Sequence, residues 1–319
     1  MVENSKTVRP QPREIIGRFA PSPTGPLHFG SLLVAVGSFC LARRQHGRWL
    51  LRIEDLDTPR VVDGAADDIL RTLETLGLYW DGEVVYQSRR SEAYTQALEQ
   101  LQEKGILFPC ACSRKDILAS APHPGEEGPI YPGTCRSGLP RGRQARAVRL
   151  RVPQEPFCFL DGVFGEMQQC LATAVGDFVL RRADGLFAYQ LAVVVDDAEA
   201  GVNQVVRGAD LLMSTPRQIY LQSLLGFAVP DYIHLPLAIN RQGEKISKRH
   251  GTVSLAAAAG GGSLIRQALR FLGQPVPQGL QGASAKEVLA WGCEHFSVAC
   301  VGWSPQVVEE DVFSVPDQS

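Results

Sequence analysis

Short apolar runs alternate with amphipathic stretches of helical length over the first hundred residues. The apolar runs predict strands at 15–19 and 49–53, because each is short and is followed by turn-forming or polar residues. Three stretches with apolar residues three and four apart, each closed by a glycine, predict helices at 31–45, 65–76 and 91–104, the last capped by Ser91. Strands separated by helices of this length favour βαβ units and an α/β fold with a parallel sheet.

The middle of the chain breaks this alternation. Residues 109–143 are rich in Pro, Gly and Cys, which predicts an irregular inserted module. Strand-like runs then follow at 146–152, 177–182, 205–212 and 232–239. The Ala-Asp-Gly sequence at 183–185 indicates a hairpin turn. The Ala- and Gly-rich stretch 256–262 predicts a connector leading to further helices.

Composition and charge narrow the possible classes of protein. The 319 residues are 45% hydrophobic and 21% charged, as in a soluble folded chain. The formal charge of −2 argues against a protein that coats nucleic acid through bulk positive charge. No apolar run approaches the roughly 20 residues that cross a bilayer, and the polar first 17 residues do not resemble a signal peptide. We therefore expect a cytoplasmic protein that does not bind membranes.

The eight cysteines fall into two groups. Five are scattered, mostly beside apolar neighbours, and are expected to be small buried hydrophobic residues in a reducing compartment: Cys40, Cys158, Cys170, Cys293 and Cys300. The other three, Cys110, Cys112 and Cys135, lie in one short segment inside the irregular module. This spacing makes the segment a candidate metal site, although three free thiols in a loop are the alternative.

The most informative segment is residues 18–31, Arg-Phe-Ala-Pro-Ser-Pro-Thr-Gly-Pro-Leu-His-Phe-Gly-Ser. A strand is expected to end here, and a helix to begin near Ser31 after a Pro- and Gly-rich loop. The backbone amides and positive end of that helix suit a phosphate. Gly30 permits close approach of a ligand, and His28 can donate a hydrogen bond to a phosphate oxygen. A loop shaped only by its turn residues is the alternative.

This segment resembles the nucleotide-binding signature of the class I aminoacyl-tRNA synthetases, in the form used by their glutamyl branch. Ser31 departs from the pattern, which usually has a second histidine there. More than 200 residues later, Lys245-Ile246-Ser247-Lys248-Arg249 resembles the Lys-Met-Ser-Lys-Ser loop of the same class. The resemblance implies a Rossmann-like, doubly wound parallel sheet and the activation of an amino acid by ATP with Mg²⁺.

Activation requires positioning and fixed positive charge, because negative charge develops on phosphate as pyrophosphate leaves. The resemblance gives the catalytic role to His28 and Lys248, and ATP contacts to His28, Gly30, Lys245 and Lys248. A solvated loop charge is the alternative for Lys245.

A pocket selective for glutamate needs an acid for the ammonium group and arginine for the carboxylates. The resemblance implies that glutamate is bound by Arg18, Phe19, Ala20, Pro21, Ser22, Glu54, Tyr189 and Arg207. From the residues alone, Tyr189 could equally be a core aromatic and Arg207 a surface charge.

The cysteine segment resembles the zinc module of the glutamyl-queuosine synthetases, in which three Cys and one Tyr bind the metal. This implies one Zn²⁺ held by Cys110, Cys112, Cys135 and Tyr131, with His123 or water as alternatives to Tyr131. Six arginines and no acid follow between 136 and 151, namely Arg136, Arg141, Arg143, Arg146, Arg149 and Arg151. Such a run is usually a solvated face, but it is also the best local candidate for contact with an RNA backbone.

Only 70 residues follow Arg249, too few for the anticodon-reading domain of a discriminating glutamyl-tRNA synthetase. Over residues 14–300 the chain therefore resembles the glutamyl-queuosine synthetases. That implies tRNA-independent activation of L-glutamate and its transfer to the cyclopentenediol of queuosine, at the wobble position in the anticodon arm of tRNA(Asp). A truncated glutamyl-tRNA synthetase charging the 3′ end and a non-catalytic RNA-binding paralogue are the alternatives.

The expected division of the chain follows from these motifs, and we expect a monomer. It comprises a tail (1–13), the first half of the nucleotide-binding domain (14–108), a zinc-containing insert (109–176), the second half of the catalytic domain with the Lys245–Arg249 loop (177–250), a helical subdomain (251–304) and an acidic tail (305–319).

Overall fold

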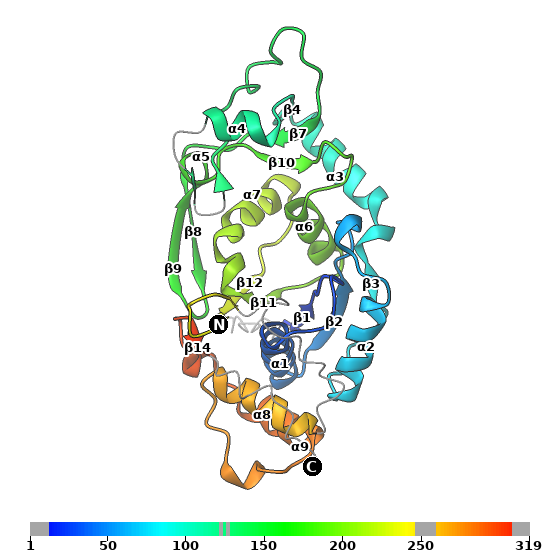
Figure 1. Ribbon diagram of the computed structural model, residues 1–319, viewed down its shortest axis with the longest axis vertical. Helices are drawn as coiled ribbons and strands as arrows, with labels where there is room; N and C mark the ends of the chain where they lie inside the picture. Colours follow the sequence, from blue (N-terminus) through cyan, green and yellow to red (C-terminus); the bar gives the residue numbers. More distant parts are fainter. Residues whose placement is uncertain (1–12, 121–123, 126–127, 246–259, 308–319) are drawn as a thin grey trace, which may run out of the picture.

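The computed structural model describes residues 13–120, 124–125, 128–245 and 260–307 (Figure 1). His123, Lys248 and most of the expected connector at 256–262 lie outside these ranges. No helix in the described ranges is long and apolar enough to cross a membrane.

A seven-stranded sheet runs through the centre of the described chain. Its strands are β1 (Ile16–Phe19), β2 (Arg48–Ile53), β3 (Val85–Tyr86), β8 (Pro156–Asp161), β9 (Gly165–Cys170), β11 (Gln204–Gly208) and β12 (Asp231–Leu235). They lie in the order β3-β2-β1-β11-β12-β8-β9, and every neighbouring pair is parallel except β8 and β9. The parallel sheet predicted from the alternating pattern is therefore confirmed. The carboxyl ends of its parallel strands meet at one edge, which is where ligands bind in folds of this kind.

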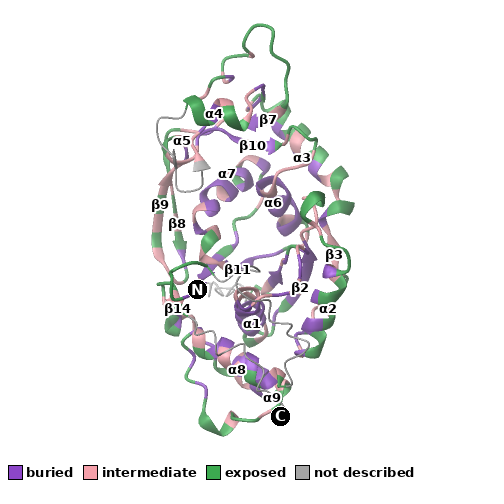
Figure 2. Ribbon diagram, viewed as in Figure 1, coloured by how far each residue is buried: buried purple, intermediate pink, exposed green. Residues whose placement is uncertain are grey.

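Helices pack against this sheet in two groups. Helices α1 (Phe29–Arg44), α2 (Ala65–Thr75), α8 (Gly261–Phe271) and α9 (Ala285–His295) share one apolar core with β1 and β2. Helices α3 (Ser91–Glu103), α6 (Tyr189–Glu199) and α7 (Thr215–Leu225) share a second core. Helices α1 and α6 are largely buried, as Figure 2 shows. The burial of α1 and α6 fixes where these two helices begin, next to residues 18–28 and at Tyr189.

A smaller antiparallel sheet carries the cysteine segment. Its strands lie in the order β10 (Phe178–Arg181), β7 (Ala147–Leu150) and β4 (Leu107–Cys110). The predicted strands at 146–152 and 177–182 correspond to β7 and β10. Between β4 and β7 the chain forms α4 (Arg114–Ser120) and a short ladder of β5 (Pro124–Gly125) with β6 (Gly128–Pro129). The rest of the described part of this segment is irregular, as its composition predicts.

Three local predictions are wrong. The strand expected at 205–212 ends at Gly208, where a Cβ would lie 2.5 Å from Asp210 Oδ1, and a 3₁₀ helix (Ala209–Ser214) turns the chain over the sheet edge. The run 232–239 is interrupted after Leu235, and β13 (Ala238–Ile239) pairs with β14 (Gln306–Val307). Ser91 is the first residue of its helix, and Arg90 occupies the N-cap.

Helices α6 and α7 and the hairpin of β8 and β9 were not predicted. Cys158 and Cys300 are exposed, so the expected burial of the scattered cysteines is wrong for these two. The remaining short elements were not predicted either. They are α5 (Leu171–Ala174) and the 3₁₀ helices Thr58–Arg60, Gln87–Arg89, Gln278–Leu280 and Val298–Cys300.

Candidate active site

One cavity of about 400 Å³ opens at the carboxyl edge of the central strands. Every predicted ATP- or glutamate-binding residue in the described chain lines it: Arg18, Phe19, Ala20, Pro21, Ser22, His28, Gly30, Glu54, Tyr189, Arg207 and Lys245. These residues come from segments up to 227 positions apart in the sequence, so their convergence on one cavity is a property of the fold. Lys248 lies outside the described residues.

His28 holds the start of α1. It is the N-cap of the helix, and its Nδ1 accepts a hydrogen bond of 3.2 Å from the backbone N–H of Ser31. Its Nε2 lies 3.2 Å from Ser31 Oγ. Ser31, which stands where related signatures have a second histidine, therefore contacts the ring of the first one. This arrangement fixes the His28 ring beside the first amides of a 16-residue helix, a setting suited to phosphate oxygens.

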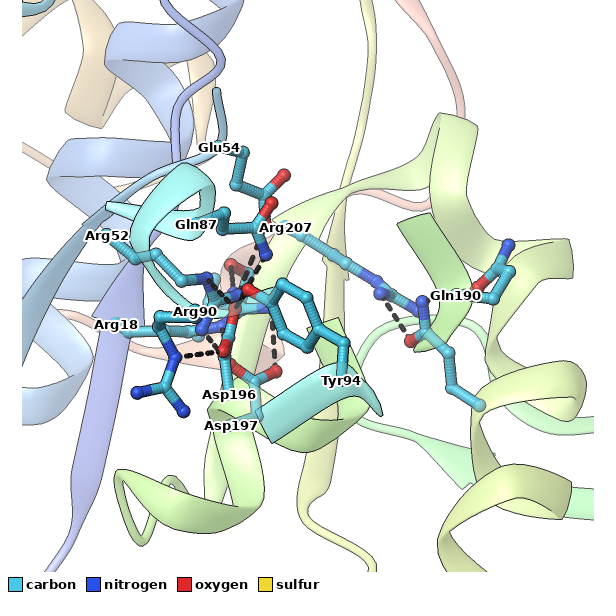
Figure 3. A network of polar contacts seen from close by, with 12 residues as sticks. Arg18, Arg52, Glu54, Gln87, Arg90, Tyr94, Gln190, Asp196, Asp197 and Arg207 are labelled. Atoms are coloured by element: carbon cyan, nitrogen blue, oxygen red, sulfur yellow. Dashed lines mark hydrogen bonds and ion pairs between the residues drawn. The ribbon is translucent and has the colours of Figure 1, made fainter. Parts of the chain in front are cut away.

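Arg18 is buried under the cavity and is held by a carboxylate that sequence reasoning missed. Its Nε and Nη2 donate to the two oxygens of Asp197 at 3.2 and 3.3 Å, and its Nη1 donates to the carbonyl of Val206. Asp197 also accepts a 2.6 Å hydrogen bond from Arg52 (Figure 3). Burial alone would raise the pKa of Asp197, but the two guanidinium groups lower it below its usual value.

The neighbouring Asp196 lies on the same helix as Asp197, α6, and bonds a different part of the structure. It accepts hydrogen bonds from Gln87 Nε2 at 2.7 Å, Arg90 Nε at 2.5 Å and Tyr94 Oη at 2.9 Å (Figure 3). The two aspartates thus tie α6 to β1 and β2 on one side and to the start of α3 on the other. The only sequence signal for them is that two adjacent acids directly follow the apolar run at 191–195.

Glu54 follows β2 and faces the same cavity. Its side chain is 11% exposed and accepts a 3.1 Å hydrogen bond from Arg52 Nη2, while its backbone N–H donates to the carbonyl of Pro21. Burial raises the pKa of Glu54, and the nearby charges of Arg52 and Arg18 offset this only in part. Burial and the charge of Glu54 also raise the pKa of Tyr189, so its hydroxyl stays protonated and can donate a hydrogen bond.

Arg207 is buried, so the alternative of a surface charge is wrong. Its Nε donates to His234 Nε2 at 2.9 Å and its Nη1 to Gln218 Oε1 at 2.7 Å. Its Nη2 donates to Thr215 Oγ1 at 2.8 Å and to the carbonyl of Leu211 at 3.3 Å. Among the residues that the structure describes, these four bonds leave one Nη1 hydrogen of the five guanidinium donors for a ligand.

Lys245 reaches the cavity from the segment that follows β13. Its Nζ forms an ion pair of 2.5 Å with Asp210 Oδ2, and both side chains line the cavity. Both side chains are exposed, 43% for Lys245 and 39% for Asp210, so a contact with ATP and the alternative of a solvated loop charge both remain open for Lys245.

The three clustered cysteines come together as the sequence predicts. Their Sγ atoms lie within 4.8 Å of one another, with Cys112 and Cys135 3.7 Å apart, and Tyr131 Oη lies 3.5 Å from Cys110 Sγ. Four tetrahedral ligands of zinc have S···S and S···O separations of about 3.8 and 3.5 Å. The donor set and its spacing therefore fit zinc. Tyr131 Oη also accepts a 2.8 Å hydrogen bond from the backbone N–H of Cys135.

The arginine-rich run is not one solvated face. Arg149 is buried, lies 3.9 Å from the centre of the Tyr131 ring and donates from Nε to Cys110 Sγ at 3.2 Å. The prediction of an RNA-contacting residue is therefore wrong for Arg149. Arg136 pairs with Asp177 and is only half-buried. The arginines of the run that are exposed are Arg141, Arg143 and Arg146.

The fold and this site define a class of enzyme. Residues 14–276 match the family model described as tRNA synthetases class I (E and Q), catalytic domain. The crystal structure of a glutamate-tRNA synthetase from Elizabethkingia anophelis superposes with a TM-score of 0.77 at 23% identity, covering 94% of this chain and 69% of that one, which shows the shared fold. The chain belongs to the class I tRNA synthetases of this glutamyl and glutaminyl type.

Curated relatives narrow the family further. The protein named Glutamyl-Q tRNA(Asp) synthetase in Dechloromonas aromatica (strain RCB) is 60% identical over 286 residues, which cover 89% of this chain and 95% of the relative. The protein of the same name in Geobacter sulfurreducens is 57% identical over 298 residues, covering 92% and 95%. Within its class, the chain is a member of the glutamyl-Q tRNA(Asp) synthetase family.

Proposed function

We propose that this protein activates L-glutamate with ATP in the absence of tRNA and transfers it to the cyclopentenediol of queuosine at the wobble position of tRNA(Asp). The observation that carries the proposal is the convergence of Arg18, Glu54 and Arg207 on the cavity that also contains the start of α1. The names of the relatives, at 57–60% identity over most of both chains, support the same reaction.

Activation begins with ATP bound as its Mg²⁺ complex, with phosphate oxygens against the start of α1. His28 and the first amides of that helix would donate to these oxygens, and Gly30 would allow the nucleotide to lie against the backbone. The glutamate α-carboxylate attacks the α-phosphorus, and pyrophosphate leaves. Fixed donors and positive charge stabilise the negative charge that develops, and we assign the additional charge to Lys245 and Lys248.

The amino acid is selected by charge. Glu54 would pair with the ammonium group, while Arg18, Arg207 and the Tyr189 hydroxyl would bind the carboxylates. Glutamine lacks the second carboxylate and would leave a buried guanidinium incompletely paired, which strongly disfavours it. Activation of glutamine with the same kcat/KM as glutamate would contradict this assignment of the pocket.

We further propose that Cys110, Cys112, Cys135 and Tyr131 hold one Zn²⁺. When bound, the metal would supply a cross-link rather than catalysis, joining β4 to the segment that precedes β7. The small apolar cluster around these residues contains few other side chains, so a cross-link would stabilise this part of the insert. The cross-linked insert presents Arg141 and Arg146 at the surface, where they would contact the phosphates of the anticodon arm.

We expect the protein to work as a monomer in the cytoplasm. The proposed reaction is tested by incubating the full chain with ATP, labelled glutamate and total tRNA that either contains or lacks queuosine, followed by nuclease fragmentation. The expected label is in the anticodon fragment of queuosine-containing tRNA only. Label at the 3′-terminal nucleotide, or in tRNA without queuosine, would instead identify the protein as a truncated glutamyl-tRNA synthetase.

A further inference from the structure

A row of three polar side chains crosses three adjacent strands beneath the amino-acid pocket. Arg207 on β11 and His234 on β12 are register partners, and Asp161 on β8 is the register partner of Tyr232, two residues before His234. All three therefore project from the same face of the sheet. Arg207 Nε lies 2.9 Å from His234 Nε2, and His234 Nδ1 lies 2.6 Å from Asp161 Oδ2. Their exposed fractions are 4%, 0% and 2%.

The chemistry of these groups fixes the direction of each hydrogen bond. A guanidinium only donates, so His234 Nε2 must be the unprotonated acceptor. The single proton of the neutral imidazole therefore sits on Nδ1, which donates to Asp161. Burial lowers the pKa of His234, consistent with a neutral ring, although Asp161 partly opposes this effect. Burial would raise the pKa of Asp161, but its hydrogen bonds lower it, so it is a carboxylate.

Arg207 differs from Arg18 in how its charge is balanced. Arg18 shares two hydrogen bonds with the carboxylate of Asp197. Within the described part of the chain, the hydrogen-bond partners of Arg207 are an imidazole, an amide, a hydroxyl and a carbonyl, and none is a carboxylate. Asp161 is linked to Arg207 only through His234, which hydrogen-bonds both of them. The positive charge of Arg207 is thus held in place but left available to an anionic group entering the cavity.

We propose that Asp161 and His234 are positioning residues that orient Arg207 for a carboxylate of the amino-acid substrate. The proposal rests on the substrate-binding role given to Arg207 above. Asp161 sets the tautomer of His234, and that tautomer presents the acceptor that holds Arg207 Nε. With Nε held by His234, and Nη1 and Nη2 held by Gln218 and Thr215, the guanidinium plane is fixed and its remaining Nη1 hydrogen is available to the substrate.

A purely structural role for Asp161 is the competing explanation. Its Oδ1 accepts hydrogen bonds of 2.9 Å from the backbone N–H groups of Val163 and Phe164, which close the turn between β8 and β9. Asparagine separates the two roles. Its carbonyl oxygen can keep both turn bonds, and its NH₂ group must then face His234. His234 Nδ1 must then accept a hydrogen bond, so the proton of the ring moves to Nε2. The Nε2–H would face the Nε–H of Arg207, and two donors cannot form a hydrogen bond.

The test uses the full chain and three variants. One is Asp161→Asn, and the other two form a matched pair at His234, namely His234→Gln and His234→Asn. His234→Gln retains an oxygen near the place of Nε2, whereas His234→Asn does not reach Arg207. Glutamate KM, ATP KM and kcat are measured by pyrophosphate exchange, and melting temperature reports folding. The tautomer is read from ¹⁵N shifts of labelled histidine, with the signals of His234 assigned by their loss in His234→Gln.

In the wild type we expect a protonated Nδ1, and in Asp161→Asn a protonated Nε2. Glutamate KM should rise at least about tenfold in Asp161→Asn and His234→Asn, and less in His234→Gln, with ATP KM within about twofold of wild type. A changed tautomer with unchanged glutamate KM, or an equal rise in both KM values, would overturn the proposal. If Asp161→Asn melts below the assay temperature, His234→Asn and His234→Gln are compared instead. A larger rise in glutamate KM for His234→Asn, with ATP KM unchanged, would support the proposal, and equal glutamate KM values would overturn it.

Arg207→Ala separates this proposal from the one on which it rests. If Arg207→Ala leaves glutamate KM unchanged, the substrate-binding role of Arg207 is wrong. If it raises glutamate KM but Asp161→Asn and His234→Asn do not, Arg207 binds the substrate without the help of the row, and only the positioning role is wrong.

Discussion

Replacing Glu54 with glutamine should separate substrate binding from stability. The variant keeps the shape of the side chain, and its carbonyl oxygen can still accept the hydrogen bond from Arg52 Nη2. What it removes is the negative charge that faces the cavity. Glu54→Gln should therefore weaken the binding of glutamate through its ammonium group and leave the local packing intact.

The size of the effect follows from the lost charge. A hydrogen bond to a charged group contributes about 1.5–3 kcal/mol, and each 1.4 kcal/mol is a factor of ten. The kcat/KM for glutamate should therefore fall about 10- to 150-fold in Glu54→Gln, with ATP KM little changed. Exposed Glu99 on α3 supplies the matched control, Glu99→Gln, which should leave both values at the wild-type level.

The raised pKa of Glu54 gives the sign of two pH effects. A carboxyl group whose pKa is higher in the folded than in the unfolded chain binds its proton more tightly when folded, so it stabilises the fold as pH falls through the folded pKa and costs stability above it. At neutral pH the melting temperature of Glu54→Gln should therefore equal or exceed that of wild type. The kcat/KM of wild type for glutamate should fall as pH drops through the raised pKa, and Glu54→Gln should lack that decline.

Pyrophosphate exchange with varied glutamate, run from neutral pH down to the ordinary pKa of glutamic acid (about 4.3), measures the pH dependence of kcat/KM. Thermal melts of the same samples measure the effect on stability. A Glu54→Gln protein with wild-type kcat/KM for glutamate would refute the pairing of Glu54 with the ammonium group. A variant that loses activity and also melts several degrees lower would show that Glu54 acts through structure.

Three further outcomes are expected. Asp197→Asn should lower the free energy of unfolding by about 3–5 kcal/mol, because it removes the carboxylate that buried Arg18 bonds and one of those that buried Arg52 bonds. Since the pKa of Asp197 is lowered, the difference in melting temperature from wild type should shrink as pH falls through that pKa. Cys110→Ser should reduce zinc, measured by elemental analysis, from about one to below about 0.1 equivalent per chain, while Cys158→Ser, an exposed thiol outside the cluster, should not. Lys248→Ala should lower pyrophosphate exchange at least about tenfold, and unchanged exchange would exclude Lys248 from the site.

The parts of the site that could be predicted from sequence are those whose residues lie close together along the chain. Residues 18–31 hold a strand end, a loop and a helix start within one segment, so their arrangement at a sheet edge follows from neighbouring residues alone. Glu54 could be placed at the same edge because it directly follows a predicted parallel strand. Cys110, Cys112 and Cys135 were grouped correctly because their separation along the chain is short.

The partners of the buried arginines could not be predicted in this way. Asp197 bonds Arg18 across 179 positions, and Asp161 bonds His234 across 73. Nothing in the local pattern distinguishes these acids from solvated ones. The hairpin of β8 and β9 was missed for a related reason: Phe157 and Phe159 are half-buried on one face while Leu160, on the other, is 73% exposed, so apolar residues occupy both faces and the period-two signal is weak.

Arg149 illustrates the limit of composition. Six arginines without an intervening acid indicate a solvated face when only the run is considered. The partners of two of these arginines belong to Asp177, outside the run. Arg149 donates to the carbonyl of Asp177, and Arg136 pairs with the Asp177 carboxylate. A buried arginine in such a run is recognisable only when the strand that pairs with β7 is known.

The order of the strands also determines when this enzyme can first work during its synthesis. β1 pairs with β2 within some thirty residues, but its other edge pairs with β11, and the backbone N–H of Ile16 is bonded to Asn203, 187 residues later. Until β11 has left the ribosome, β1 has an open edge and Arg18 has no Asp197. The nascent chain must therefore carry a strand with one open edge through the synthesis of the whole cysteine-containing insert, an interval in which strand-pairing errors and a need for chaperones are expected.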